Sequence, residues 1–286
     1  MKNKTAIIGS NGQLGSDLSK IYGEDAVNLT RKEIEVTDFS MCRKVLGKIN
    51  PDVVINCAAY VKVDDAEIYP LEAFSVNSIG AKNIAMVSEE LNSTNVYIST
   101  DYVFDGRKGT PYTEDDLPNP INVYGMSKYL GECLTQCYSR KYYIFRVSSL
   151  FGKAGSSGKG GNFIETMIST AERNEEIKVV DDIFMSPTYT KDAAFLIKSL
   201  IEKNPEFGIY HLNNSGQCSW YEFATEIFKI MNLNPDIQKI DSKDLDRKAE
   251  RPIFSALNNQ KLQKLGVCPK DWKSGLISHL QGEDYL

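Results

Sequence analysis

The chain has 286 residues, of which 42% are hydrophobic and 25% charged, with a formal net charge of −5. A chain of this size can bury a large core, so one large α/β unit or a nucleotide domain with a smaller partner is expected. The acidic balance argues against a nucleic-acid groove, although a local basic pocket for a phosphorylated ligand remains compatible with it.

Neither a membrane segment nor a disulfide framework is expected. The N-terminal run MKNKTAIIGS leads directly into a strand, and no stretch approaches the roughly 18 apolar residues of a spanning helix. Six cysteines are scattered without a Cys-x-x-Cys pair, which suits reduced thiols, and two histidines do not suggest a histidine-rich metal site. We therefore expect a cytoplasmic protein with no metal, membrane partner or nucleic-acid partner.

The first predicted element is a strand that runs into a glycine-rich turn and a helix. The segment TAIIGSNGQLG covers residues 5–15, and the helix has Leu14, Leu18 and Ile21 on one face. Glycines allow a tight turn and close approach to a pyrophosphate, while the helix N-terminus supplies amide hydrogens. The pattern predicts dinucleotide binding, with an ordinary strand–helix turn as the alternative. The candidate contacts are Gly9, Asn11, Gly12, Gln13, Leu14 and Gly15.

The segment after the second predicted strand bears on the choice of cofactor. The strand AVNL (26–29) is followed by Thr30, Arg31 and Lys32. A carboxylate there would hold the adenosine ribose 2′-hydroxyl, whereas this chain offers one hydroxyl and two cations. NADPH is therefore predicted and NADH is possible, although an exposed basic surface turn would have the same sequence.

Two more segments are expected to reach the cofactor cleft. Asp38 is a candidate adenine contact, the N-cap of the next helix, or both. The apolar VVI of PDVVINCAAY (51–60) predicts a central parallel strand. Ala58 and Ala59 at its end would let a nicotinamide ribose approach, although small residues also pack well under helices. Asn77, in the following helix, is expected either to bond a strand backbone or to be satisfied by the core or by solvent.

A threonine, a tyrosine and a lysine form the candidate catalytic set. The run VYIS (96–99) predicts a buried strand, so Thr100 and Asp101 should emerge at its carboxyl end, where open α/β sheets place their ligands. Tyr124 and Lys128 are four residues apart at the start of a predicted helix, which puts both on one face. About one Tyr-x-x-x-Lys pair is expected by chance in this chain, so the spacing alone does not indicate a catalytic pair. The prediction depends on the strand upstream of the pair and on the glycine turn near the N-terminus.

These residue types suit the reduction of a ketone. The reaction needs a hydride from a nicotinamide and a proton for the developing alkoxide. A free tyrosine has a pKa of about 10, and a neighbouring lysine cation would favour phenolate and lower that pKa. Tyr124 is the predicted proton donor, Lys128 tunes it and holds ribose hydroxyls, and Thr100 polarises the carbonyl. The alternative is a packing aromatic beside a solvated lysine.

Downstream, the chain is expected to build a smaller unit. The segment GKAGSSGKGG (152–161) has five glycines in ten residues, which predicts a hinge or an active-site lid. Short helices and strands then alternate without dinucleotide features. The predicted architecture is α/β, with a Rossmann-type doubly wound parallel sheet in residues 1–150 and a smaller C-terminal substrate-binding lobe, mainly residues 151–286. Segments around 185–212 are expected to return to the first domain.

Seven segments together resemble the extended short-chain dehydrogenase/reductases and, within them, the dTDP-4-dehydrorhamnose reductases. They are GSNGQLG (9–15), PDVVINCAAYVKVDDAE (51–67), STDYVFDG (99–106), Tyr124 with Lys128, RVSSLFG (146–152), SPTYTKDAA (186–194) and RPIFSALNNQKL (251–262). The resemblance implies NADPH-dependent reduction of the 4-keto group of dTDP-4-dehydro-6-deoxy-L-mannose to dTDP-L-rhamnose. It also implies a homodimer.

The resemblance assigns site residues as well. The family's catalytic threonine, tyrosine and lysine fall on Thr100, Tyr124 and Lys128. The cofactor cleft is expected to include Asp38, Phe39, Ala59, Tyr60 and Val61, in addition to the glycine turn, Arg31 and Ala58. The substrate side is expected to include Thr100, Asp101, Tyr102, Ser149, Asn162 and Arg251, with Asp101 on the sugar and Asn162 and Arg251 on the nucleotide diphosphate. Family members often have tryptophan in place of Ser149, which leaves other 4-keto sugars open.

Three other functions stay open on this sequence. A nucleotide-sugar 4-epimerase needs the same three residues but retains tightly bound NAD, against which Arg31 argues mildly. A 4,6-dehydratase would follow the threonine with Asp-Glu, whereas here Asp101 is followed by Tyr102. A non-catalytic NADP-binding regulatory subunit, like the one that accompanies methionine adenosyltransferase, would bind cofactor without turnover.

Overall fold

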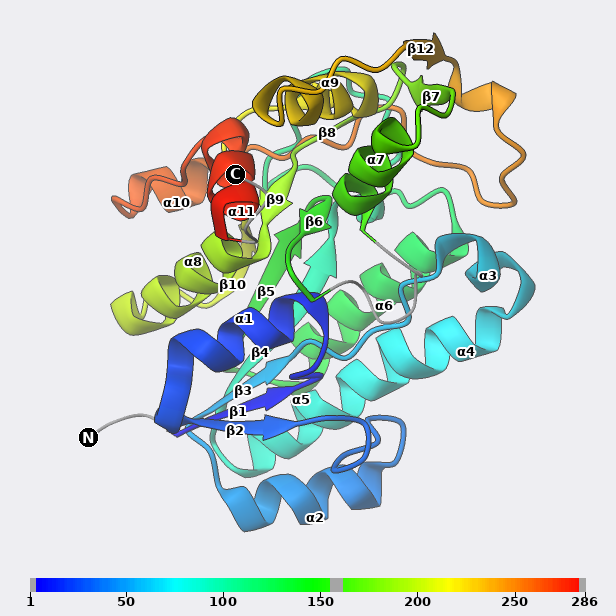
Figure 1. Ribbon diagram of the computed structural model, residues 1–286. Helices are drawn as coiled ribbons and strands as arrows, with labels where there is room; N and C mark the ends of the chain where they lie inside the picture. The colour runs from blue at the N-terminus through cyan, green and yellow to red at the C-terminus, as the bar shows by residue number, and fades with distance from the viewer. Residues whose placement is uncertain (1–3, 155–161, 283–286) are drawn as a thin grey trace.

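The computed structural model describes residues 4–154 and 162–282. Figure 1 shows a layer of strands with helices on both faces, and a smaller group of elements, including α7, α9 and β7, on one side of that layer. Most of the predicted hinge or lid, residues 155–161, lies outside the described residues. Among the helices of the described ranges, none is long and apolar enough to cross a bilayer.

The central sheet has six parallel strands in the order β10-β5-β4-β3-β1-β2. Their bounds are β1 (Thr5–Ile8), β2 (Ala26–Leu29), β3 (Val53–Asn56), β4 (Thr94–Thr100), β5 (Tyr142–Val147) and β10 (Gly208–His211). The chain builds outward from β1 in one direction through β2 and then in the other through β3, so β1 and β3 flank a topological switch point. The predicted doubly wound Rossmann-type sheet is confirmed.

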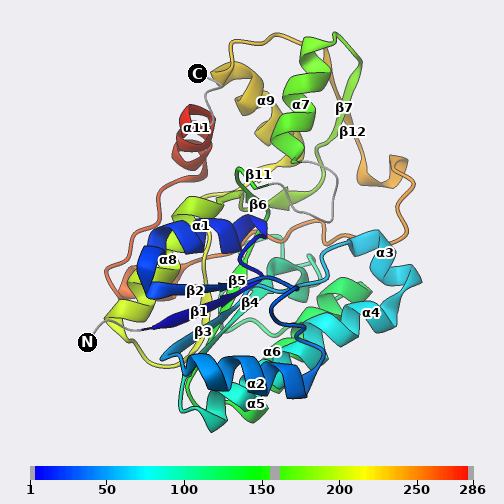
Figure 2. The ribbon, with the colours of Figure 1, turned by 60° about the horizontal axis from the view of Figure 1, so that its bottom comes forward.

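Both faces of this sheet are buried, because alternate strand residues point to opposite sides. Ile7, Ile55 and Phe145 pack with α1 and α8 on one face, while Ile8 and Val54 pack with α2 and α5 on the other. Figure 2 shows the first pair of helices above the strands and α2, α5 and α6 below them. The bounds are α1 (Gln13–Tyr22), α2 (Phe39–Ile49), α5 (Gly80–Glu90), α6 (Val123–Tyr138) and α8 (Thr190–Lys203).

A second hydrophobic cluster holds the elements beside the sheet. It is centred on buried aromatic and aliphatic side chains that include Phe151, Ile168, Phe223, Trp272 and Leu276. The elements of this region are β6 (Leu150–Phe151), α7 (Phe163–Glu172), β7 (Ile177–Val180), β8 (Phe184–Met185), β9 (Thr188–Tyr189), β11 (Cys218–Ser219), α9 (Trp220–Ile230), β12 (Ile237–Ile240) and α11 (Trp272–Gly282). The short helix α10 (Gln260–Lys264) packs instead on the large sheet, since Leu262 belongs to the cluster around Ile7 and Phe145. Between β9 and β11 the chain passes back to the large sheet, where α8 packs on α1 and β10 pairs with β5.

Candidate active site

The turn between β1 and α1 has the backbone geometry that a phosphate-binding loop requires. Gly9 has a φ of +75°, and its amide donates to the Leu29 carbonyl oxygen at 2.8 Å. A Cβ on Gly15 would lie 2.2 Å from the Gly9 carbonyl oxygen, so only glycine lets α1 begin this close to β1. No side chain caps α1 at Gly12, which leaves first-turn amide hydrogens for an anion.

The candidate residues after β2 occupy an exposed turn and a helix cap. The Arg31 side chain is 84% exposed, and its Nε donates to Glu35 Oε2 at 2.6 Å. Asp38 caps α2, since its carboxylate accepts from the Met41 amide at 3.0 Å. The expected N-cap role of Asp38 is therefore confirmed, and its adenine contact stays a prediction.

Two asparagine side chains hold the loop that follows β3. The Ala58 amide donates to Asn56 Oδ1 at 3.1 Å, and the Tyr60 amide donates to Asn77 Oδ1 at 2.8 Å. Asn77 Nδ2 donates to the Tyr60 carbonyl at 3.0 Å and to Ser127 Oγ at 2.9 Å. Asn77 is fully buried in a π-helical turn (Ser75–Ile79), and it ties the predicted cofactor loop to the helix that carries Tyr124.

The three candidate catalytic residues lie near the end of β4. Thr100 is the last residue of this strand, and its hydroxyl lies close enough to the Tyr124 phenol to affect the pKa of that phenol. Tyr124 lies in the first turn of α6, which Asn122 caps by accepting from the Gly125 amide at 2.8 Å. One turn further on, the buried Lys128 directs its Nζ to the Ile98 carbonyl oxygen at 2.5 Å and lies 4.3 Å from the Tyr97 ring centroid.

Burial sets the protonation of this group. It raises the pKa of Tyr124 well above its ordinary value, while the Thr100 hydroxyl acts more weakly in the other direction. It lowers the pKa of Lys128 to about 7, against the opposing charge of Glu132. Tyr124 is thereby held as a neutral phenol, the form that can give up a proton. The direction differs from the lowering expected beside a lysine, because burial of the phenol dominates.

Asp101 is a buried anchor for this group. Its Oδ1 accepts from Thr100 Oγ1 at 3.1 Å, and its Oδ2 accepts from Ser148 Oγ at 2.9 Å and Ser255 Oγ at 2.5 Å. Burial raises the pKa of Asp101, and the hydrogen bonds from these hydroxyls partly offset that rise. Both carboxylate oxygens already have partners, so Asp101 orients Thr100 here. Its predicted contact with the sugar stays a prediction.

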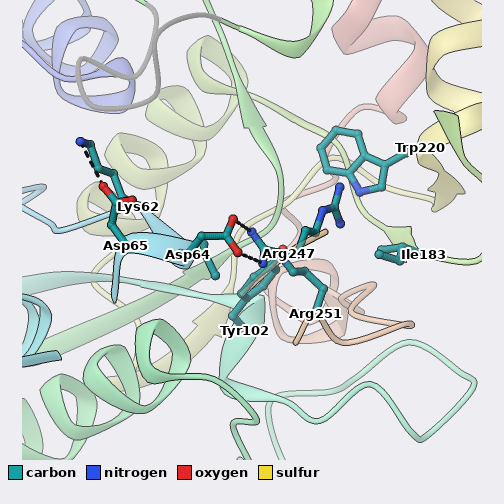
Figure 3. A pocket seen from close by; sticks show the side chains of 9 residues that line it. Lys62, Asp64, Asp65, Tyr102, Ile183, Trp220, Arg247 and Arg251 are labelled. Atoms are coloured by element: carbon teal, nitrogen blue, oxygen red, sulfur yellow. Dashed lines mark hydrogen bonds and ion pairs between the residues drawn. The ribbon is translucent and has the colours of Figure 1, made fainter. Parts of the chain in front are cut away.

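A cavity of about 550 Å³ adjoins the candidate catalytic tyrosine (Figure 3). Its lining residues come from both parts of the chain: Lys62, Val63, Asp64, Asp65, Tyr102, Ile183, Trp220, Arg247 and Arg251. The Tyr102 ring meets the Tyr124 ring edge-on, with centroids 5.8 Å apart, which connects the cavity wall to the phenol. The volume is in the range of small-molecule sites.

Two arginines lie in one wall of the cavity, and only one of them is paired with a carboxylate of the described part of the chain. The Nη1 and Nη2 atoms of Arg251 donate to the two carboxylate oxygens of Asp64 at 2.6 and 2.5 Å. Arg247 forms no ion pair with any residue of the described ranges, and burial, followed by the like charge of Arg251, lowers the pKa of its guanidinium. Guanidinium groups beside the aromatic Trp220 suit a ligand that is both anionic and planar.

Of the predicted substrate residues, Tyr102 and Arg251 line this cavity, whereas Thr100, Asp101, Ser149 and Asn162 do not. Asn162 caps α7: its Oδ1 accepts from the Ile164 amide at 3.0 Å and its Nδ2 donates to the Gly152 carbonyl at 3.2 Å. Ser149 has a φ of +42°, in the left-handed region, and its carbonyl accepts from the Thr188 amide at 3.2 Å. Both side chains therefore occupy positions where the backbone turns.

Seven lining residues were missed by sequence reasoning: Lys62, Val63, Asp64, Asp65, Ile183, Trp220 and Arg247. Trp220 follows Ser219, which with Glu222 forms a capping box at the start of α9. That signal predicts a helix start but not the cavity into which the indole faces. The other six have no local pattern that points to a cavity, because only the folded chain brings them together.

Comparison with known proteins gives a family. The family model described as the RmlD substrate binding domain matches residues 3–284. The chain belongs to this family. It is 39% identical to the spore coat polysaccharide biosynthesis protein SpsK of Bacillus subtilis (strain 168) over 281 residues. The aligned part is 97% of this chain and 97% of the relative. The chain is 36% identical to a dTDP-4-dehydrorhamnose reductase of Aggregatibacter actinomycetemcomitans over 286 residues. The aligned part is 94% of this chain and 96% of the relative.

A solved structure within the same range of similarity extends the match to three dimensions. The crystal structure of dTDP-4-dehydrorhamnose reductase from Bacillus anthracis str. Ames, in complex with NADP, has a TM-score of 0.93 and 38% sequence identity. It covers 99% of this chain, and this chain covers 100% of it. The predicted family resemblance is therefore confirmed over nearly the whole sequence.

Proposed function

We propose that the protein is an NADPH-dependent oxidoreductase, a dTDP-4-dehydrorhamnose reductase that converts dTDP-4-dehydro-6-deoxy-L-mannose to dTDP-L-rhamnose. The observation that carries the chemistry is the position of Thr100 at the carboxyl end of β4, next to Tyr124 in the first turn of α6, with Lys128 one turn further along that helix. In a parallel sheet this edge is where ligands bind. Relatives named as dTDP-4-dehydrorhamnose reductases support the substrate class.

The proton step follows from the state of Tyr124. A bound NADPH would supply the hydride for the carbonyl carbon, and the neutral Tyr124 phenol would donate its proton to the carbonyl oxygen. The Thr100 hydroxyl, which donates its one proton to Asp101 Oδ1 in this structure, would turn toward the same oxygen to polarise it. Protonated Lys128, close by on α6, electrostatically favours the Tyr124 phenolate that the proton transfer leaves.

The chain has the groups that a bound NADPH requires. The amides of the glycine turn, from Gly9 to Gly15, would hold the pyrophosphate at the start of α1. The exposed Arg31 guanidinium would meet the 2′-phosphate, since its only ion pair in the described ranges is with a residue of its own turn. Asn11, Gln13, Leu14, Asp38, Phe39, Ala58, Ala59, Tyr60 and Val61 complete the proposed cleft.

The cavity is the proposed site of the nucleotide part of the substrate. Arg247 and Arg251 would bind the diphosphate, and Trp220 offers a flat surface for the base. We therefore infer that residues 1–150 bind the cofactor and that residues 151–286 mainly bind the substrate. A homodimer and a cytoplasmic location belong to the same proposal, and analytical ultracentrifugation tests the first.

The test is NADPH oxidation by the purified protein with dTDP-4-dehydro-6-deoxy-L-mannose, repeated with NADH and with UDP- and GDP-linked analogues. Formation of dTDP-rhamnose with loss of NADPH is the expected result. Turnover of a different keto sugar would keep the reductase and change the substrate. NAD retained through purification, with epimerisation of a sugar, would replace the proposal by a 4-epimerase.

A further inference from the structure

A short helix, α3 (Val63–Ile68), joins the substrate cavity to the C-terminal part of the chain. One oxygen of Asp64, Oδ1, accepts from the Lys248 and Ala249 amides at 3.0 Å each and from Arg251 Nη1 at 2.6 Å. Its other oxygen accepts from Arg251 Nη2 at 2.5 Å. Figure 3 shows the paired contacts between the two side chains. One carboxylate thus holds both the backbone and the guanidinium of a segment far along the chain.

The same helix also holds the start of α6. Glu67 Oε1 accepts from the Val123 amide at 2.8 Å, one residue before Tyr124. Asn122 Nδ2 donates to the Glu250 carbonyl at 2.8 Å and closes the connection between α6 and the C-terminal segment. The position of Arg251 relative to the Tyr124 phenol is therefore set by three polar contacts around α3.

Arg251 depends on Asp64 for its orientation. Its side chain is only 13% exposed, and its Nη1 also donates to the Ala249 carbonyl at 2.6 Å. The hydrogen bonds from Arg251 hold the pKa of Asp64 well below its usual range, so the carboxylate stays charged across the physiological range. A bidentate carboxylate fixes the plane of a guanidinium, which a single contact does not.

We propose that Asp64 is a positioning residue for substrate binding: it holds segment 248–251 so that Arg251 is presented to the diphosphate of a nucleotide sugar. The inference rests on the proposed function and adds a role for α3. An alternative is that Asp64 competes with the ligand for Arg251. The geometry favours positioning, because two backbone amides bind the same carboxylate and keep the segment in place whatever the guanidinium contacts.

The experiment measures dTDP binding by isothermal titration calorimetry to the wild type, Asp64→Asn, Arg251→Ala and the double variant. Asparagine keeps the size of the side chain and one acceptor, but it loses the charge and the bidentate pair. We expect Asp64→Asn to raise the Kd of dTDP about tenfold, as the loss of one charge-assisted contact implies. The double variant should bind no more weakly than Arg251→Ala, because Asp64 acts through Arg251.

Two further measurements separate positioning from a general loss of structure. Glu175→Gln breaks another bidentate pair, which Glu175 forms with Arg173 at an exposed site just after α7. This variant should leave dTDP binding unchanged. NADPH binding should be the same in Asp64→Asn as in the wild type. In turnover, Asp64→Asn should raise KM by about the same tenfold factor and change kcat by less than about threefold.

Each result decides one of the two proposals. Unchanged or tighter dTDP binding in Asp64→Asn overturns the positioning role, and so does a double variant clearly weaker than Arg251→Ala. Absence of dTDP binding to the wild type also overturns it. If the wild type binds dTDP and the variants behave as expected, but no keto sugar is reduced, positioning stands and the reductase proposal fails.

Discussion

The two sides of the candidate site are built in different ways. The glycine turn that would hold the cofactor is one continuous stretch, residues 9–15, whose backbone geometry is set by Gly9 and Gly15. The substrate cavity is lined by side chains from residues 62–65, Tyr102, Ile183, Trp220, Arg247 and Arg251. The first side depends on backbone conformation and the second on side-chain charge and tertiary packing.

This difference predicts which side changes more easily. A substitution at Gly15 brings a side chain against the Gly9 carbonyl and disturbs the start of α1. A substitution at Arg247 changes the charge of the cavity without touching a strand or helix of the central sheet, since this residue lies in the segment after β12. Cofactor binding is therefore expected to tolerate few sequence changes, and substrate choice more of them.

The largest expected effect is at Tyr124, which faces both sides. Tyr124→Phe should lower kcat by about 10²- to 10⁴-fold, because it removes the proposed proton donor. The Kd values of NADPH and dTDP should hardly change, since the ring remains. Stopped-flow kinetics and calorimetry measure these quantities, with Tyr138→Phe, at the exposed end of the same helix, as the matched control. Full turnover by Tyr124→Phe would remove this residue from the mechanism.

The next largest effect is expected on the cofactor side of the site, as a loss of unfolding free energy. Asn77→Ala leaves the Tyr60 amide and carbonyl without their side-chain partner, which should cost about 2–4 kcal/mol of unfolding free energy. Asn83→Ala, which loses a single bond to the Val36 carbonyl, should cost about 1 kcal/mol. Urea denaturation gives both values. Equal losses would show that Asn77 does not hold the loop after β3 more firmly than an ordinary buried amide.

A smaller effect concerns Lys128 and depends on pH. Burial lowers the pKa of Lys128 to about 7, so between that value and its ordinary 10.5 the unfolded chain binds a proton that the folded chain does not. Stability from this group is therefore lost as pH falls through about 7. From pH 7 to pH 9 the cofactor-free wild type should gain about 2 kcal/mol relative to Lys128→Met.

Urea titrations at the two pH values measure this difference, with Lys44→Met, at an exposed position of α2, as the control for general charge effects. A constant difference between wild type and Lys128→Met at both pH values would mean that the buried ammonium keeps its ordinary proton affinity. The result would then argue that water reaches this side chain.

The smallest effect should be at Arg31, on the exposed rim of the cofactor side. Arg31→Ala should raise the Kd of NADPH about tenfold and leave that of NADH nearly unchanged, since only NADPH has the 2′-phosphate. Arg43→Ala, which breaks another exposed ion pair, is the control. Equal weakening of both cofactors would refute the phosphate contact.

The same contrast explains what could be predicted from the sequence. The sheet and the glycine turn were predictable because β-rich runs and glycine positions act locally, and Thr100 was placed correctly because it ends a buried strand. The upward shift in the pKa of Tyr124 was not, since the sequence does not show how deeply the phenol is buried. The role of Asp64 at the cavity was not predictable either, because residues 248–251, to which it is hydrogen-bonded, come near it only when the chain folds.

The late return of β10 to the sheet has a consequence for synthesis of the protein. β10 pairs with β5 in parallel, but the chain must first pass through α7, β7, β8, β9 and α8. On the ribosome, the edge of β5 therefore has no partner strand until residue 211 has emerged. Unpaired parallel edges promote wrong pairing, so a fragment that stops at residue 150 should aggregate rather than fold as a nucleotide-binding unit.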